Sequence, residues 1–182
     1  MPRLLLAALI AGALASPAEA QHHGHGPQAA DATPHGGFQR REIKALSDQQ
    51  IADLRAGRGM GLALAAELNG YPGPMHVLEL AGQLSLSPEQ RDRTSAALAA
   101  MSQEAITIGA QVIAAELELD RLFAIRTVTQ QIMAAAVNEI AAAQARLRAL
   151  HLGYHLVMAT ILTPEQAAAY ARLRGYGPVR GG

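Results

Sequence analysis

A helix-start signal occurs twice in this chain, as Leu-Ser-Pro-Glu-Gln at residues 86–90 and as Leu-Thr-Pro-Glu-Gln at residues 162–166. In each copy the hydroxyl side chain can accept a hydrogen bond from the third helical amide, and the glutamine can accept one from the amide of the cap residue. Proline suits the first helical position, where no N–H is needed. A looser copy, Leu-Ser-Asp-Gln-Gln, stands at residues 46–50. The sequence therefore predicts three helices that begin just after these caps.

Two long apolar seams lie between the signals and advance in alternating steps of three and four residues, which is the spacing of helices packed along one another. The first seam is Leu98, Met101, Ala105, Ile108, Val112, Ala115, Leu119 and Leu122, and the second is Ile140, Ala143, Leu147, Leu150, Tyr154, Val157 and Ile161. No strand pattern is present. We predict an all-α fold with a long antiparallel helical hairpin, about residues 88–122 and 129–160, and shorter flanking helices.

The segment at residues 46–68 is also predicted to be helical, with a bend or break at Gly57, Gly59 and Gly61, because each interior glycine costs about 1 kcal/mol relative to alanine. With only two Phe and no Trp, one hairpin has little large side-chain mass to bury. We therefore expect a homodimer to supply further buried surface.

The N-terminus has the layout of a secretory signal peptide. Arg3 precedes an apolar run, and Ala18-Glu19-Ala20 matches the small-x-small cleavage pattern. The predicted organisation is a signal peptide at 1–20, a disordered His-rich linker at 21–45, a helical domain at 46–176 and a tail at 177–182. An uncleaved membrane anchor is the less favoured alternative, because the apolar run is shorter than the roughly 20 residues that span a bilayer.

Composition excludes several function classes. Fifteen basic and fifteen acidic residues balance without a basic block, which argues against a nucleic-acid partner. The chain has no cysteine, so disulfides and thiolate metal sites are excluded. No hydrolase, zincin or phosphate-loop motif is present, and we interpret the protein as not an enzyme.

The most informative side chains for chemistry lie just before the second signal. At 100° per residue, His151, His155 and Met158 fall within about 60° of one another on a helix. Two histidines at i, i+4 can offer ring nitrogens to one ion, and a thioether suits softer transition metals. Two interpretations are open. These residues are metal ligands, or they are a core methionine with one seam histidine and one surface histidine.

Other histidines give weaker signals. His76 and Glu79, at i, i+3, can complete a metal site if their short helix packs against the hairpin; otherwise His76 caps a turn and Glu79 is solvated. The linker histidines can bind Zn, Cu or Ni without defined geometry, or they belong to a plain linker. These linker residues are His22, His23, His25 and His35.

The exported all-helical pattern with two Leu-[Ser/Thr]-Pro-Glu-Gln signals resembles the LTxxQ-motif periplasmic family, over about residues 46–176. The resemblance implies a periplasmic dimer of bent helical hairpins. Within the family, the chain is most similar to the heavy-metal sensor and resistance branch, whose site uses histidines of an early helix and a His-x3-Met pair before the second motif. This chain has one early histidine, His76, where the sensors have two, and His155 stands where the pair has methionine.

Two functions therefore compete at this stage. The first is a periplasmic transition-metal-binding protein (Ni, Co, Zn or Cu) that acts as a heavy-metal sensor or resistance accessory, with a membrane-bound anti-sigma factor or histidine kinase as its signalling partner. The second is an ATP-independent chaperone of the Spy/CpxP type that binds unfolded periplasmic proteins. The chain's neutral charge favours the first, because such chaperones carry a basic concave surface.

Overall fold

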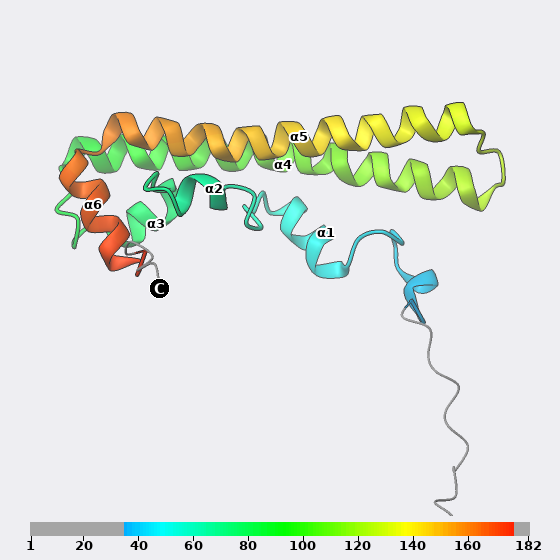
Figure 1. The fold of residues 1–182 in the computed structure, drawn as a ribbon, viewed down its shortest axis with the longest axis horizontal. Helices are drawn as coiled ribbons and strands as arrows, with labels where there is room; N and C mark the ends of the chain where they lie inside the picture. The colour runs from blue at the N-terminus through cyan, green and yellow to red at the C-terminus, as the bar shows by residue number, and fades with distance from the viewer. Residues whose placement is uncertain (1–34, 177–182) are drawn as a thin grey trace, which may run out of the picture. The chain divides into compact units, whose positions relative to one another are not determined.

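The computed structural model describes residues 35–176, and residues 37–176 belong to one all-helical unit without strands (Figure 1). The predicted all-α class is confirmed. The elements are the 3-10 helix η1 (Phe38–Arg40) and the α-helices α1 (Asp48–Arg55), α2 (Leu64–Glu67), α3 (Pro74–Glu79), α4 (Pro88–Ala124), α5 (Gln130–Ile161) and α6 (Pro164–Leu173). The predicted signal peptide, His22, His23, His25 and the tail at 177–182 lie outside the described residues.

The long pair of helices α4 and α5 organises this unit. The two helices lie side by side (Figure 1) and are joined by residues 125–129, and Thr129 caps α5 through a hydrogen bond from the Ile132 amide. Their bounds lie within two residues of the predicted segments 88–122 and 129–160. Helices α1 and α3 pack on α4, and α2 and α3 also contact α5.

The two helix-start signals bind each other through their glutamines. Each closes its own capping box, with Ser87 N to Gln90 Oε1 at 3.1 Å and Thr163 N to Gln166 Oε1 at 2.9 Å. The two amides also exchange hydrogen bonds of 2.8 and 3.0 Å. Gln90 further donates to the carbonyl of Ile161, and Gln166 to that of Leu84. The starts of α4 and α6 are thus fixed at one point.

Glycines interrupt the predicted helix at 46–68, as expected. Gly57 (φ 63°) ends α1, and Gly61 (φ 76°) precedes α2; both values lie in the left-handed region that glycine adopts without steric cost. A different glycine, Gly109 on α4, lets α1 approach closely, because a Cβ atom there would overlap the carbonyl of Leu54.

Two clusters of buried side chains form the core. One joins α1 to the middle of the helix pair, and the other joins α3 to α6 and the end of α5. Ile43 is fully buried in the first cluster, and Lys44 pairs with Asp120 at 2.9 Å. The packed unit therefore begins before residue 46, inside the segment predicted as a linker, because Ile43 supplies an apolar side chain that α4 and α5 cover.

By length and composition, α4 alone among the described helices could cross a membrane. Length and composition alone do not identify a membrane-spanning helix, because the central helix of a packed bundle meets the same criterion.

Replacing either paired glutamine should destabilise the unit. Gln90→Ala or Gln166→Ala removes a capping-box acceptor and leaves a part-buried carbonyl unpaired, which should cost about 1–3 kcal/mol in urea unfolding. In a double-mutant cycle the two positions should couple by about 0.5–3 kcal/mol. Gln50→Ala is the matched control, because Gln50 closes an exposed capping box and makes no hydrogen bond to another helix among residues 35–176. Its cost should be about 1 kcal/mol or less. Equal losses at all three positions would contradict the role of the pair.

Alanine at Gly109 should destabilise although it is a better helix former than glycine. The added methyl group must push α1 away from α4, at a cost of about 1–3 kcal/mol. Gly153→Ala on α5 is the control, because a Cβ atom there meets nothing within 4 Å; it should instead stabilise by up to about 1 kcal/mol. Thermal unfolding of the two variants should therefore shift in opposite directions.

Candidate metal-binding cleft

A cleft of about 380 Å³ is bordered by residues 56–64, the first turn of α3, and facing parts of α4 and α5. It brings together His76, His151 and His155, which the sequence placed on two separate helices. Its residues that carry charged groups, ring nitrogens, hydroxyls or sulfur are Arg58, Met60, Glu67, Met75, His76, Met101, Ser102, His151, His155, Arg174 and Tyr176. We name it the histidine cleft.

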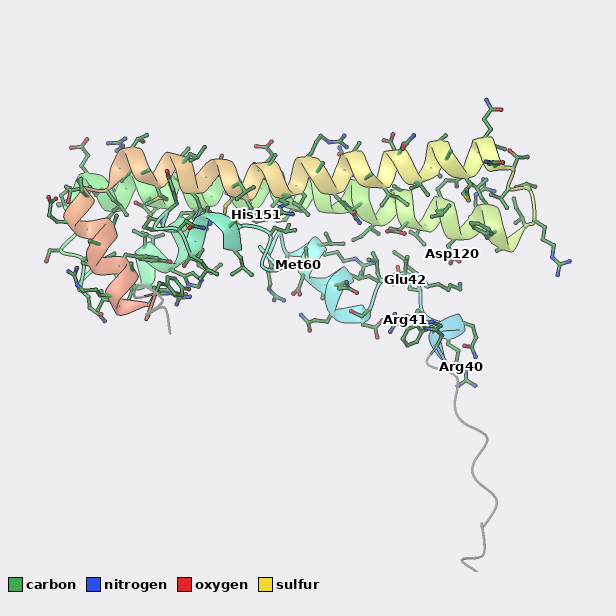
Figure 2. The ribbon with its side chains drawn as sticks, viewed as in Figure 1. Arg40, Arg41, Glu42, Met60, Asp120 and His151 are labelled. Carbon is green, nitrogen blue, oxygen red and sulfur yellow. The ribbon has the colours of Figure 1, made fainter. Side chains whose placement is uncertain are left out.

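His151 lies at the base of this cleft with only 3% of its surface exposed. Its Nε2 atom is buried and has no hydrogen-bond partner among residues 35–176. Burial, with a smaller effect of His155, lowers the pKa of the His151 ring. The loop before α2 covers it: a Cβ atom at Gly59 would lie 3.7 Å from Nδ1. Figure 2 labels His151 on α5 and Met60 in this loop. The cleft is therefore lined by a neutral imidazole with one buried ring nitrogen that is unpaired among the described residues.

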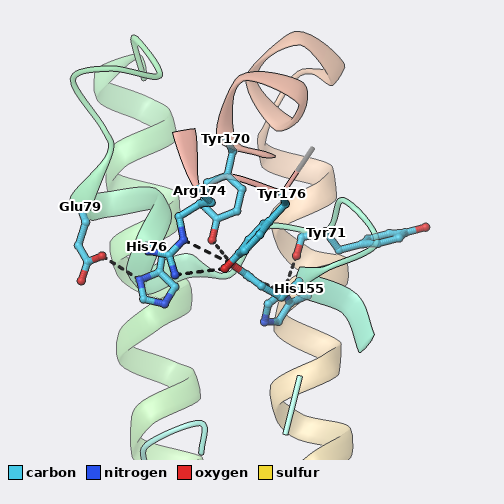
Figure 3. A network of polar contacts seen from close by, with 8 residues as sticks. Tyr71, His76, Glu79, His155, Tyr170, Arg174 and Tyr176 are labelled. Atoms are coloured by element: carbon cyan, nitrogen blue, oxygen red, sulfur yellow. Dashed lines mark hydrogen bonds and ion pairs between the residues drawn. The ribbon is translucent and has the colours of Figure 1, made fainter. Parts of the chain in front are cut away.

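His155, one turn further along α5, is oriented by the backbone. Its Nδ1 lies 2.6 Å from the carbonyl oxygen of Tyr71 (Figure 3), and since a carbonyl can only accept, Nδ1 must carry the proton. In the neutral ring, Nε2 is then the atom with the free lone pair. A Cβ atom at Gly73 would lie 3.1 Å from Nε2, so the loop before α3 lies tightly against this ring.

A polar network centred on Glu67 borders His155. The buried Glu67 carboxylate accepts a short hydrogen bond from the Tyr170 hydroxyl, and its oxygens lie 3.7 Å from His155 Nδ1 and 3.9 Å from Arg174 Nε. Burial first, and then this hydrogen bond, raises the pKa of Tyr170. Figure 3 shows the side chains of Tyr170, Arg174 and Tyr176 close together; Arg174 donates a hydrogen bond of 3.3 Å to the Tyr176 hydroxyl. The network therefore connects α2 and the end of α6 to α5, the helix that carries His155.

His76 lies at the edge of the cleft, and its side chain is 35% exposed. Its Nδ1 pairs with Glu79 Oε2 at 2.8 Å (Figure 3). Glu79 is thus placed to orient His76.

The remaining predicted ligands lie elsewhere. Met158 is fully buried in the second core cluster, with Val77 and Tyr170, and His35 lies exposed before η1. Among residues 35–176, no group of three or more His, Cys, Asp or Glu side chains is close enough to hold a metal ion; this argues neither for nor against metal binding.

The buried face of α5 differs from the predicted one. The predicted seam continued through Tyr154 and Val157, but Val157 is 40% exposed, whereas His151, His155 and Met158 are buried. The reason is that α2, α3 and the loop before each of them cover the histidine side of the helix.

Sequence reasoning missed Glu67 and the methionines Met60, Met75 and Met101. Glu67 did carry a signal, because it is the lone carboxylate in the otherwise apolar run at residues 62–68. The methionines carried none, since methionine in an apolar pattern ordinarily indicates core packing.

Comparisons with protein-family models, with curated proteins and with solved structures found no match for this chain. The LTxxQ resemblance therefore rests on the two helix-start signals themselves.

Acid should destabilise the metal-free protein through His151. When a histidine has a lower pKa in the folded state than in the unfolded state, the unfolded chain binds the proton more tightly. The free energy of unfolding is therefore highest above the unfolded-state pKa and decreases as the pH falls below it. Urea unfolding in the presence of a chelator should show lower stability at pH 5.5 than at pH 7.5. His151→Gln should reduce this difference, whereas an unchanged difference would assign it to other groups.

Proposed function

We propose that this chain is a periplasmic transition-metal-binding protein, not an enzyme, that acts as a heavy-metal sensor or resistance accessory. The observation that carries the proposal is the pair of buried histidines on α5: His151 has a buried Nε2 with no hydrogen-bond partner among the described residues, and His155 uses its Nδ1 for the carbonyl of Tyr71. A buried, unpaired ring nitrogen costs free energy, and coordination to a metal would remove that cost.

The orientation of His155 supports the same function. Histidines that bind metals usually donate their other ring N–H to a carbonyl or a carboxylate, which fixes the tautomer and the ring plane. His155 does so to Tyr71, and Glu79 is placed to do the same for His76. The lowered pKa of His151 keeps that ring neutral, as a ligand must be. His151 and His155 are the proposed nitrogen ligands, and His76 at the edge of the same cleft is a further candidate.

The proposed protein signals through a partner. As in the sensors that it resembles, that partner would be a membrane-bound anti-sigma factor or histidine kinase. We also propose that α4 and α5 form an antiparallel helical hairpin and that this hairpin pairs with a second copy of the chain. The end of the pair α4 and α5 carries exposed apolar side chains that support such pairing, namely Phe123, Ile125, Ile132, Met133 and Val137.

Calorimetric titration with Ni²⁺, Co²⁺, Cu²⁺ and Zn²⁺ tests metal binding. The linker histidines must be removed so that they do not bind metal themselves, but deleting residues 21–45 would also remove Ile43 from the core. The parent protein for these titrations should therefore carry Asn in place of His22, His23, His25 and His35. We expect about one ion per chain with a Kd of about 1 μM or below, equivalent to about −8 kcal/mol or beyond. His151→Gln and His155→Gln should each weaken binding at least about tenfold, which is about 1.4 kcal/mol.

Unchanged affinity in the double variant His151→Gln/His155→Gln, with the helical circular dichroism of the parent, would refute the site. Loss of binding only when the four linker histidines are replaced would assign the metal to the linker.

A chaperone is the second candidate, and exposed apolar residues favour it. Leu64, Leu68, Tyr71 and Leu156 are each more than 40% exposed around α2 and the facing part of α5. A second cleft, of about 570 Å³, lies on the α1 side of Met60 and is lined by Leu54, Leu62 and Leu147 among others. Suppression of client aggregation by the metal-free protein would distinguish this function from metal sensing.

A further inference from the structure

The histidine cleft is unusually rich in thioether sulfur. Three of the chain's six methionines line it: Met60 from the loop before α2, Met75 from the first turn of α3 and Met101 from α4. They come from three different elements, so the spacing of residues along one helix does not explain why they line the same cleft. Only the fold places them around the same cleft as His151 and His155.

Two of these methionines are not packed as core residues. Met60 is 41% exposed and Met75 is 45% exposed, whereas Met101 is 7% exposed. A half-exposed methionine gains little from burial, and its sulfur can meet a ligand from solvent. The exposed pair belongs to the two segments that carry Gly59 and Gly73, the glycines that lie against His151 and His155.

The backbone at Met60 adds a second observation. Met60 has φ of 44°, in the left-handed region that residues with a side chain rarely adopt. It lies between Gly59 and Gly61 in a loop held against α4, where a Cβ atom at Gly57 would lie 2.8 Å from the Ser102 carbonyl oxygen. Such unfavourable backbone conformations concentrate at ligand sites. The fold thus holds a methionine, at a conformational cost, beside the cleft.

The cationic groups of the cleft have acidic neighbours. Arg58 binds Asp53 at 2.6 Å, and Arg174 Nε, which makes no hydrogen bond among residues 35–176, lies 3.9 Å from Glu67. The Glu67 carboxylate in turn accepts a hydrogen bond from the Tyr170 hydroxyl. The uncharged donors that line the cleft are imidazole nitrogens and thioethers. A neutral set that includes soft sulfur donors suits a soft, singly charged ion better than a divalent one, and thioether ligands select Cu(I) among biological transition metals.

We propose that the histidine cleft selects cuprous copper, with Met60 and Met75 adding thioether ligands to Nε2 of His151 and His155. This inference rests on the proposed function and specifies its ion. Copper remains Cu(I) on binding, so the step needs no oxidant or reductant.

The test uses the full chain with the four linker histidines replaced by Asn, in anaerobic buffer. Cu(I) is supplied as its bicinchoninate complex, and the chelator's colour reports the competition. Met60→Leu/Met75→Leu, which conserves side-chain volume, should weaken Cu(I) binding at least about tenfold while changing Zn²⁺ and Ni²⁺ affinity less than about twofold. Met133→Leu is the matched control, because Met133 is 37% exposed and does not line the cleft; it should leave Cu(I) affinity unchanged.

X-ray absorption of the Cu(I)-loaded parent gives a readout that does not depend on variants. A sulfur shell should be present in the parent and the Met133 variant and reduced in the double methionine variant. No sulfur shell in the parent, or Cu(I) affinity in Met60→Leu/Met75→Leu equal to that of the parent, overturns the thioether assignment. In that case the proposed function still stands if the double variant His151→Gln/His155→Gln binds at least one of the tested metal ions more weakly than the parent does. If that histidine variant binds every ion as the parent does, the proposed function fails as well.

Discussion

The reciprocal hydrogen bonds of Gln90 and Gln166 are the interaction on which the rest of the unit depends. Each glutamine completes the capping box of its own helix and satisfies a carbonyl just before the other helix. The end of α5 is therefore fixed beside the start of α4, and α6 must leave from the same point. This direction of α6 carries Tyr170 and Arg174 to Glu67. The polar network beside His155 is thus a distant consequence of two capping residues.

Glycines determine how closely the loops and α1 approach the long helices. Gly109 allows α1 to lie on α4, while Gly59 and Gly73 bring the backbone against His151 and His155. A Cβ atom would overlap the Leu54 carbonyl at Gly109 and press on the His155 ring at Gly73, whereas at Gly59 it would make an ordinary contact with His151. The histidines are buried because backbone, not large side chains, covers them, and their ring nitrogens consequently remain near the cleft.

Helical spacing in the sequence grouped part of the candidate site, and contacts between distant segments decided where the other residues lie. Helical spacing placed His151, His155 and Met158 on one face, and they are indeed buried together. The same spacing could not separate a cleft from a core, so Met158, proposed as a ligand, packs with Val77 instead. Glu67 and the cleft methionines were missed because their neighbours come from segments distant in sequence.

By itself the sequence determined the local structure. Ser87, Pro88, Thr163 and Pro164 fixed the helix starts, the glycines at 57–61 fixed the break, and the apolar seams specified an all-helical fold, because caps, φ preferences and periodicity act within a few residues. Only the tertiary structure decided which helix face is covered, where the folded unit begins, and which side chains share the cleft. Those outcomes depend on contacts between segments far apart in the chain, which no local pattern encodes.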